Sequence, residues 1–165
     1  MRICVIIPVY NEQDSILNCL QSLARQNYKD FEVVVVDDGS TDQTVDRVKQ
    51  AFMGKKNLLL LSQNHQGPGA ARNLGVGKTN AQILVFVDAD MQFATDFIKT
   101  LTAPIVKGET IGTFSKEEYL LNKQNALARC WNLNMGRKAE KMHPDNYPDT
   151  QPVFRAILRS KFEQA

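Results

Sequence analysis

Three runs of apolar residues in the first half of the chain each end in a cluster of polar residues. The runs cover residues 2–7, 31–36 and 83–87 and have the length and β-branched content of strands buried on both faces. Helical patterns separate them, so we expect parallel strands whose carboxyl ends share one edge of a sheet. Ligands bind at that edge in open α/β sheets. The sequence therefore predicts an α/β fold, with a mostly parallel sheet, helices on both faces and a crevice where the runs end.

Apolar spacing also predicts the elements around these runs. Helices are expected over residues 14–26, 40–52, 69–76 and 95–106, and a short strand over 57–61. Two pairs, Ser40 with Gln43 and Ser115 with Glu118, have the spacing of capping boxes at helix N-termini. The second pair predicts a long helical stretch to about residue 141, formed by one helix or by two. Residues 151–158 are expected to add a strand.

Composition excludes several classes of protein. The chain has 165 residues, which suits one domain, and a net charge of +2 is too small to indicate binding to nucleic acid. The three cysteines form no Cys-x-x-Cys pair, so neither a zinc nor a redox motif is present, and we expect buried thiols in a reducing compartment. A strand begins at once and no apolar run approaches ~20 residues. We therefore expect a cytoplasmic protein, in solution or at the inner face of a membrane.

Two carboxylates, Asp88 and Asp90, follow the run that ends at residue 87. At ~6 Å and an effective dielectric constant of ~20 they would repel each other by roughly 3 kcal/mol. A divalent cation removes this repulsion, and carboxylate oxygens suit Mg²⁺ or Mn²⁺. The alternative is a solvated turn that contains two acidic residues.

A glycine-rich segment, residues 67–75, resembles a phosphate-binding loop but fails the known patterns. Arg72 stands where Gly-x-Gly-x-x-Gly needs its third glycine, and again where the Gly77-Lys78-Thr79 sequence would need the first glycine of a P-loop. Binding of NAD and Walker-type binding of ATP are therefore excluded. A helix N-terminus with an arginine one turn in suits a diphosphate. Alternatively, Arg72 pairs with a structural carboxylate.

Other polar residues at the strand ends also have two interpretations. Tyr10 could stack on a planar base or be simply half-buried, and Glu12 could cap the following helix. Asp38 could accept an N–H from a base edge or cap the helix after residue 39. Because Asp38 lies at a strand end, its replacement is expected to leave the fold intact. The two histidines, His65 and His143, have no partners at metal-ligand spacing and are expected to be structural or exposed.

These motifs, in this order and spacing, resemble glycosyltransferase family 2, whose members have the GT-A fold. The resemblance rests on residues 8–12, 36–42, 64–75 and 88–90, and residues 91–165 match only loosely. It implies a GT-A-type, Rossmann-like sheet and a UDP-, GDP- or dTDP-sugar as donor. It also implies Mn²⁺ or Mg²⁺ as cofactor and inverting transfer of the sugar to an acceptor hydroxyl on a glycan, a lipid or a small molecule.

The resemblance also implies roles for single residues. The implied donor site contains Pro8, with Tyr10 and Asp38 holding the base, Glu12 near the ribose, Arg72 at the diphosphate, Asp88 at the ribose or metal, and Asp90 at the metal. Residues 1–110 are then a nucleotide-sugar-binding α/β domain. Residues 111–165 are an incomplete acceptor-side region of the same domain, which we expect to self-associate or to bind a partner.

The catalytic base has no counterpart at the expected place. Family members carry it in an acidic motif after a Gly-Gly turn, downstream of a segment that resembles residues 154–165. The sequence thus predicts a chain truncated before that motif, with Asp145, Asp149 and Glu163 as the late carboxylates available in its place. A module that binds a sugar nucleotide without transferring the sugar is the main alternative. An assembly domain is a second alternative. A nucleotidyltransferase would need a Gly-rich, arginine-containing loop after the first strand, which residues 8–11 do not provide.

Overall fold

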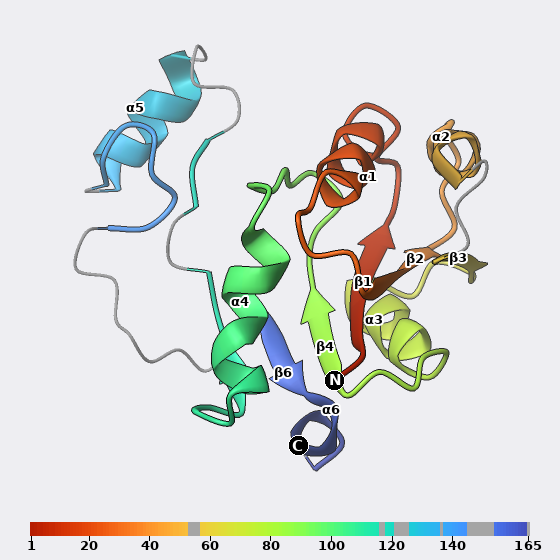
Figure 1. Ribbon diagram of the computed structural model, residues 1–165. Coiled ribbons are helices and arrows are strands. Elements are labelled where there is room, and N and C mark those ends of the chain that lie inside the picture. The colour runs from red at the N-terminus through yellow and green to blue at the C-terminus, as the bar shows by residue number, and fades with distance from the viewer. Residues whose placement is uncertain (53–56, 116–117, 121–125, 136, 145–153, 165) are drawn as a thin grey trace. The chain divides into compact units, whose positions relative to one another are not determined.

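The computed structural model of the chain describes residues 1–52, 57–115, 118–120, 126–135, 137–144 and 154–164 (Figure 1). It divides into two compact units, one formed by Met1–Thr113 with Arg155–Ala165 and the other by Phe114–Phe154. The strands are β1 (Ile3–Val9), β2 (Phe31–Asp37), β3 (Leu58–Ser62), β4 (Ile83–Phe86), β5 (Gly112–Thr113) and β6 (Ala156–Leu158). The helices are α1 (Ile16–Ala24), α2 (Thr44–Phe52), α3 (Pro68–Val76), α4 (Phe97–Val106), α5 (Ala126–Asn134) and α6 (Arg159–Phe162).

The first unit contains one six-stranded sheet with the order β3-β2-β1-β4-β6-β5. Strands β1 to β4 are parallel to one another, whereas β6 pairs antiparallel with both β4 and β5. The predicted mostly parallel α/β sheet is therefore confirmed. The described part of the predicted strand 151–158 contains β6, while residues 151–153 lie outside the described residues.

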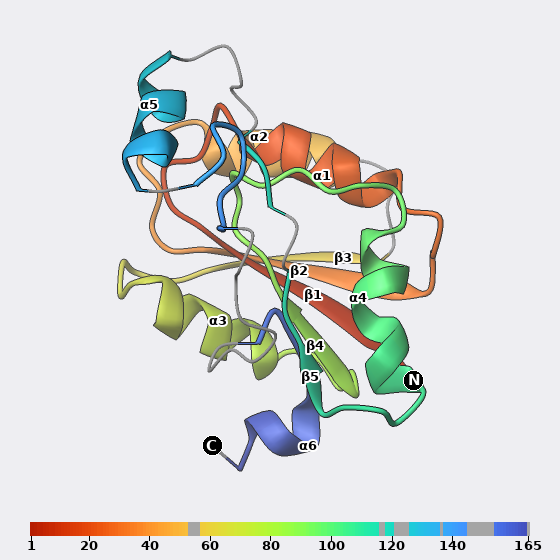
Figure 2. The same cartoon turned by 90° about the vertical axis from the view of Figure 1, so that its left-hand side faces the viewer.

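Helices cover both faces of this sheet, as predicted (Figure 2). Alternate residues of β1, such as Val5 and Ile7, join a core with α1, α2 and α4. The other face carries α3, and α6 also lies there because the ring of Phe162 packs 5.4 Å from that of Phe86. Burial on both faces explains why the strands read as continuous apolar runs.

Helix α3 lies unusually close to the sheet at Gly75. A Cβ at this position would lie 2.7 Å from Cγ2 of Ile6 and 3.3 Å from Cγ2 of Val36. Only a residue without a side chain fits at that distance. The contact fixes α3, and with it Arg72, against β1 and β2.

The predicted capping box at Ser40 and Gln43 is wrong. Helix α2 begins at Thr44, whose backbone N–H donates to Asp42 Oδ1 at 2.9 Å. The Ser40 hydroxyl instead accepts the backbone N–H of Asn11 at 3.0 Å. The serine thus joins two strand ends rather than capping the helix that follows it.

The predicted helical stretch that starts at Ser115 is also wrong. In the second unit, Tyr119 forms an antiparallel bridge with Lys141, and α5 is the helix among the described residues of this region. The buried side chain of Asn132 donates to the backbone oxygens of Ala139, at 3.3 Å, and Lys141, at 2.8 Å. These bonds hold the segment after α5 against the helix, so the chain folds back instead of continuing. Of the helices in the described ranges, none is both long enough and apolar enough to span a bilayer.

Candidate functional site

The carboxyl ends of β1, β2 and β4 lie side by side, as the apolar runs predicted. In the parallel register Pro8 is opposite Val36 and Val9 is opposite Asp37, while β4 pairs with β1 on its other side. Pro8 is buried inside β1. Tyr10 follows β1 and is 42% exposed.

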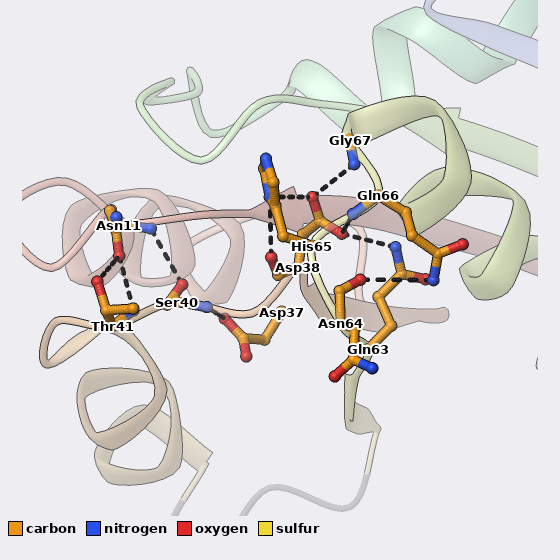
Figure 3. A network of polar contacts seen from close by, with 10 residues as sticks. All are labelled: Asn11, Asp37, Asp38, Ser40, Thr41, Gln63, Asn64, His65, Gln66 and Gly67. Atoms are coloured by element: carbon orange, nitrogen blue, oxygen red, sulfur yellow. Dashed lines mark hydrogen bonds and ion pairs between the residues drawn. The ribbon is translucent and has the colours of Figure 1, made fainter.

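A polar network ties the end of β1 to the end of β2 (Figure 3). Asn11 Oδ1 accepts the backbone N–H of Thr41 at 2.8 Å, and the Asn11 N–H donates to Ser40. Asn11 has φ of 54°, in the left-handed region that asparagine tolerates better than most residues. The Glu12 N–H donates to the hydroxyl of Thr44 at 2.7 Å. Part of the matched motif therefore has a structural role, which is to hold two loops together.

Asp38 is buried beneath the loop that follows β3, and its side chain is surrounded by donors. Oδ1 accepts from Gln63 Nε2 at 2.6 Å and from the Gln66 N–H at 2.9 Å, and Oδ2 accepts from the Gly67 N–H at 2.8 Å. The residue is 2% exposed. It caps the loop that leads into α3, not the helix after residue 39. The expectation that the fold would tolerate its loss is therefore not supported by its surroundings.

The same surroundings change the acidity of this carboxyl group. Burial by itself raises the pKa of Asp38, but the hydrogen bonds from Gln63, Gln66 and Gly67 outweigh burial and leave the pKa lowered. Nearby His65 lowers the pKa of Asp38 further. Asp38 is therefore a carboxylate at neutral pH and acts only as an acceptor.

His65 lies at this site, although its sequence context gave no sign of it. Its Nδ1 is 2.8 Å from Oδ2 of Asp38, and its ring centroid is 4.1 Å from that of Tyr10. The loop comes this close because Gly39 lies beneath it. A Cβ at Gly39 would be 3.0 Å from the backbone nitrogen of His65, and φ is +80° there.

Asp88 lies between two arginines just after β4. Arg72 donates to Oδ1 at 2.7 Å, and an Arg155 nitrogen lies 3.4 Å from Oδ2. The contact with Arg72 is the carboxylate pair that sequence reasoning gave as an alternative. Arg155 was not predicted, because its approach depends on β6 pairing with β4 from a distant part of the chain.

The buried thiol of Cys19 on α1 is influenced by the charges of three carboxylates. Burial raises the pKa of Cys19 to about 12, and the negative charges of Asp90, Asp88 and Glu12 contribute to that shift. The Glu12 side chain also accepts the hydroxyl hydrogen of Ser15 before α1. The described residues contain no group of three His, Cys, Asp or Glu side chains arranged to hold a metal ion.

Of the late carboxylates, the structure describes only Glu163. It pairs with Arg159 on α6 at 2.7 Å, and the Arg159 N–H donates to the backbone oxygen of Gln82 just before β4. Asp88 lies after the opposite end of the same strand, so the structure does not bring Glu163 to the strand ends. Asp145 and Asp149 lie outside the described residues.

The chain is similar to known proteins in sequence and in fold. Residues 4–165 match the family model for glycosyl transferase family 2. The chain is 38% identical over 106 residues to the glycosyltransferase GlyA of Streptococcus pneumoniae, an alignment that covers 64% of this chain and 15% of that protein.

Two solved structures are similar as well. TarS of Staphylococcus aureus in complex with UDP-GlcNAc aligns with a TM-score of 0.67 and 34% identity, over 74% of this chain and 36% of that one. The mannosyltransferase PcManGT of Pyrobaculum calidifontis, in complex with GDP-Man and Mn²⁺, aligns with a TM-score of 0.63 and 30% identity, over 69% and 35%. The chain thus spans well under half the length of these proteins. With a family model that covers nearly all of its residues, a mostly parallel sheet and GT-A-type structural neighbours, this chain belongs to glycosyltransferase family 2.

Proposed function

We propose that the chain binds a nucleotide-diphosphate sugar where β1, β2 and β4 end. One observation carries this proposal. Tyr10, Asp38 and Asp88 come from three parallel strands and stand at the same edge of the sheet. The structural neighbours support it, because TarS has been captured with UDP and with UDP-GlcNAc, and PcManGT with GDP-Man.

Each part of the nucleotide has a proposed partner. The base stacks on the exposed ring of Tyr10 and donates an N–H to the Asp38 carboxylate, with Pro8 in the strand beneath. Uracil, thymine and guanine all carry such an N–H, so UDP-, dTDP- and GDP-sugars fit this arrangement. Glu12 lies near the ribose, and Arg72 turns its guanidinium toward the diphosphate.

We propose a divalent cation, Mn²⁺ or Mg²⁺, at Asp88 and Asp90. Such ions are commonly held in proteins by one or two carboxylates together with phosphate oxygens of the substrate. Asp88 and Asp90, two residues apart after β4, would supply the carboxylates of such a site. When bound, the cation would neutralise the charge of the departing diphosphate.

The proposed reaction of the whole protein is inverting transfer of the sugar to a hydroxyl of a glycan, a lipid or a small molecule. It needs a carboxylate base within hydrogen-bond reach of that hydroxyl. Glu163 pairs with Arg159 by the other end of β4. The base therefore stays unassigned, which keeps binding without transfer as the second candidate. A cytoplasmic location and self-association through residues 111–165 also stay predictions.

The test is calorimetric titration of the chain with UDP in the presence of Mn²⁺, beside an assay for UDP-sugar hydrolysis. We expect Arg72→Ala to weaken UDP binding about 10- to 100-fold, because a charge-assisted hydrogen bond contributes roughly 1.5–3 kcal/mol. Lys78→Ala is the matched control, since it removes one positive charge from an exposed position just after α3. Equal losses in both variants would indicate a general charge effect and contradict the proposed site. UDP binding without hydrolysis would favour the second candidate.

A further inference from the structure

The imidazole of His65 occupies a defined position at the proposed base site. Its ring packs on the ring of Tyr10, with centroids 4.1 Å apart and planes inclined by 30°. Its Nδ1 lies 2.8 Å from Asp38 Oδ2 and 3.1 Å from the Asp38 backbone oxygen (Figure 3). The side chain is nevertheless 57% exposed. The His65 ring is thus held at the surface by its packing on Tyr10 and by the contact of its Nδ1 with Asp38.

The Asp38 carboxylate has no acceptor site left for a further donor. A carboxylate has about four lone-pair sites. Oδ1 accepts from Gln63 and from the Gln66 backbone, and Oδ2 accepts from the Gly67 backbone and faces Nδ1 of His65. A base that donates to Asp38 must therefore displace one of these donors.

His65 is the donor that can leave most readily. The Gln66 and Gly67 N–H groups belong to the backbone that leads into α3, and moving them would disturb the start of that helix. The Gln63 side chain is partly buried beside Asp38. His65, in contrast, is mostly exposed, and rotation of its side chain would free Oδ2 of Asp38 and the face of Tyr10 together.

We propose that His65 fills the base subsite of the free protein and leaves it when a nucleotide binds. This inference rests on the proposed function. The imidazole reproduces the features expected of a bound base, which are a flat ring on Tyr10 and an N–H directed at Asp38. His65 therefore competes with the nucleotide. The apparent dissociation constant is the intrinsic one divided by the fraction of molecules whose subsite is open, so His65 sets nucleotide affinity without touching the bound nucleotide.

The first test is titration of the chain and of His65→Ala with UDP and Mn²⁺. We expect UDP to bind His65→Ala several-fold more tightly, because the competing ring is gone while Tyr10 and Asp38 remain. Asn64→Ala is the matched control from the same loop, since Asn64 offers only its backbone oxygen, to Gln66, in the described hydrogen bonds. It is expected to bind UDP as the unaltered chain does. Thermal melting of both variants checks that they fold.

A second measurement follows the His65 ring directly. The chain contains two histidines, so the imidazole NMR signals of His65 are assigned by their loss in His65→Ala. We expect signals shifted upfield by the Tyr10 ring in the free protein, which move toward ordinary histidine positions as UDP and Mg²⁺ are added. Addition of Mg²⁺ in place of paramagnetic Mn²⁺ keeps these signals sharp.

The outcomes separate the inference from the proposed function. If the unaltered chain binds UDP but His65→Ala binds it equally or more weakly, the inference is overturned and His65 is a bystander or a wall of the occupied site. His65 signals that keep their upfield shift in saturating UDP would also overturn it. If neither the chain nor His65→Ala binds UDP, GDP or dTDP, the proposed function itself fails and the inference falls with it.

Discussion

Arg72 donates to one oxygen of Asp88 at 2.7 Å, while Arg155 approaches the other oxygen at 3.4 Å. The Asp88 side chain is 47% exposed, so solvent weakens both pairs and they contribute little to stability. The two pairs instead fix positions, because Asp88 holds the guanidinium groups of Arg72 and Arg155 at the end of β4. Asp90, two residues later, has no ion pair or hydrogen bond to another side chain in the described ranges. The two carboxylates of this motif therefore have different surroundings.

This difference predicts that Asp90 contributes more to the proposed cation than Asp88 does. Adding Mn²⁺ should raise the UDP affinity of the unaltered chain by some factor. In Asp90→Ala this gain should be at least about tenfold smaller, which corresponds to ~1.4 kcal/mol of binding free energy. Calorimetric titration with Mn²⁺ and with excess EDTA measures that gain. Asp46→Ala, which removes an exposed carboxylate on α2, is the control and should keep the full gain. Equal UDP affinity of the unaltered chain in Mn²⁺ and in EDTA would refute the cation site.

Asp38→Asn is expected to destabilise the fold at neutral pH. The change leaves donors of the loop after β3 facing an amide, so we expect the free energy of unfolding to fall by about 1–3 kcal/mol. Because the pKa of Asp38 is lowered in the folded chain, its contribution is present above the unfolded value of about 3.9 and is lost as pH falls through the folded value.

The unaltered chain and Asp38→Asn should therefore become more similar in stability as pH falls below about 4. Urea denaturation at several pH values between about 7 and 3 measures the difference. Asp42, whose pKa is also lowered, remains in both proteins, so some acid sensitivity persists in the variant. Asp30→Asn, on an exposed loop, is the control. A constant difference across this pH range would mean that the Asp38 carboxyl group does not titrate with unfolding.

Much of the sheet could be predicted because burial on both faces leaves a local signal. The apolar runs of β1, β2 and β4 carry that signal, and their parallel order followed from the helices between them. Strand β5 could not be predicted, since Gly112–Thr113 is a strand only because β6 pairs with it from much later in the chain. Strand pairing of this kind is a property of the fold and not of the segment.

The positions of Tyr10, Asp38 and Asp88 at strand ends could be predicted from the sequence, but the contacts around them could not. Ser40 has the local pattern of a helix cap. Its hydroxyl instead accepts a hydrogen bond from the backbone N–H of Asn11, 29 residues away. His65 was expected to be structural or exposed because no ligand spacing surrounds it. Its contact with Tyr10 depends on the loop after β3 folding back over the end of β1.

Gly75→Ala should lower stability although alanine favours helices. The added methyl group would lie 2.7 Å from Ile6 Cγ2, so α3 must move away from the sheet at a cost of about 1–3 kcal/mol. Gly77→Ala is the matched control, because the nearest atom to its Cβ would be 3.5 Å away and its φ of −65° suits alanine. Denaturation by urea compares the two variants. Equal stability of Gly75→Ala and the unaltered chain would show that α3 is not held at this distance.

The three thiols should differ sharply in reactivity. Burial raises the pKa of both Cys4 and Cys19 to about 12, and both side chains are fully buried, whereas Cys130 on α5 is exposed. Alkylation requires an accessible thiolate. We therefore expect iodoacetamide at pH 8 to modify Cys130 alone in the folded chain and all three thiols in guanidinium chloride. Mass spectrometry of peptides locates the modified residues, and folded Cys130→Ser should remain unmodified over the time in which Cys130 of the unaltered chain is fully labelled.

Slow labelling of Cys19 would then report on the proposed site, because the Cys19 thiol contacts the backbone oxygen of Asp88 at 3.8 Å. Reaching this thiol requires α1 to separate from the segment that follows β4. A nucleotide and cation bound at Asp88 and Asp90 would oppose that separation, since a ligand stabilises the state that binds it. UDP with Mn²⁺ should therefore slow the labelling of Cys19 in Cys130→Ser more than that of Cys4, which lies in the middle of the sheet. Equal slowing of both thiols would indicate that the ligand acts through global stability and not at this edge of the sheet.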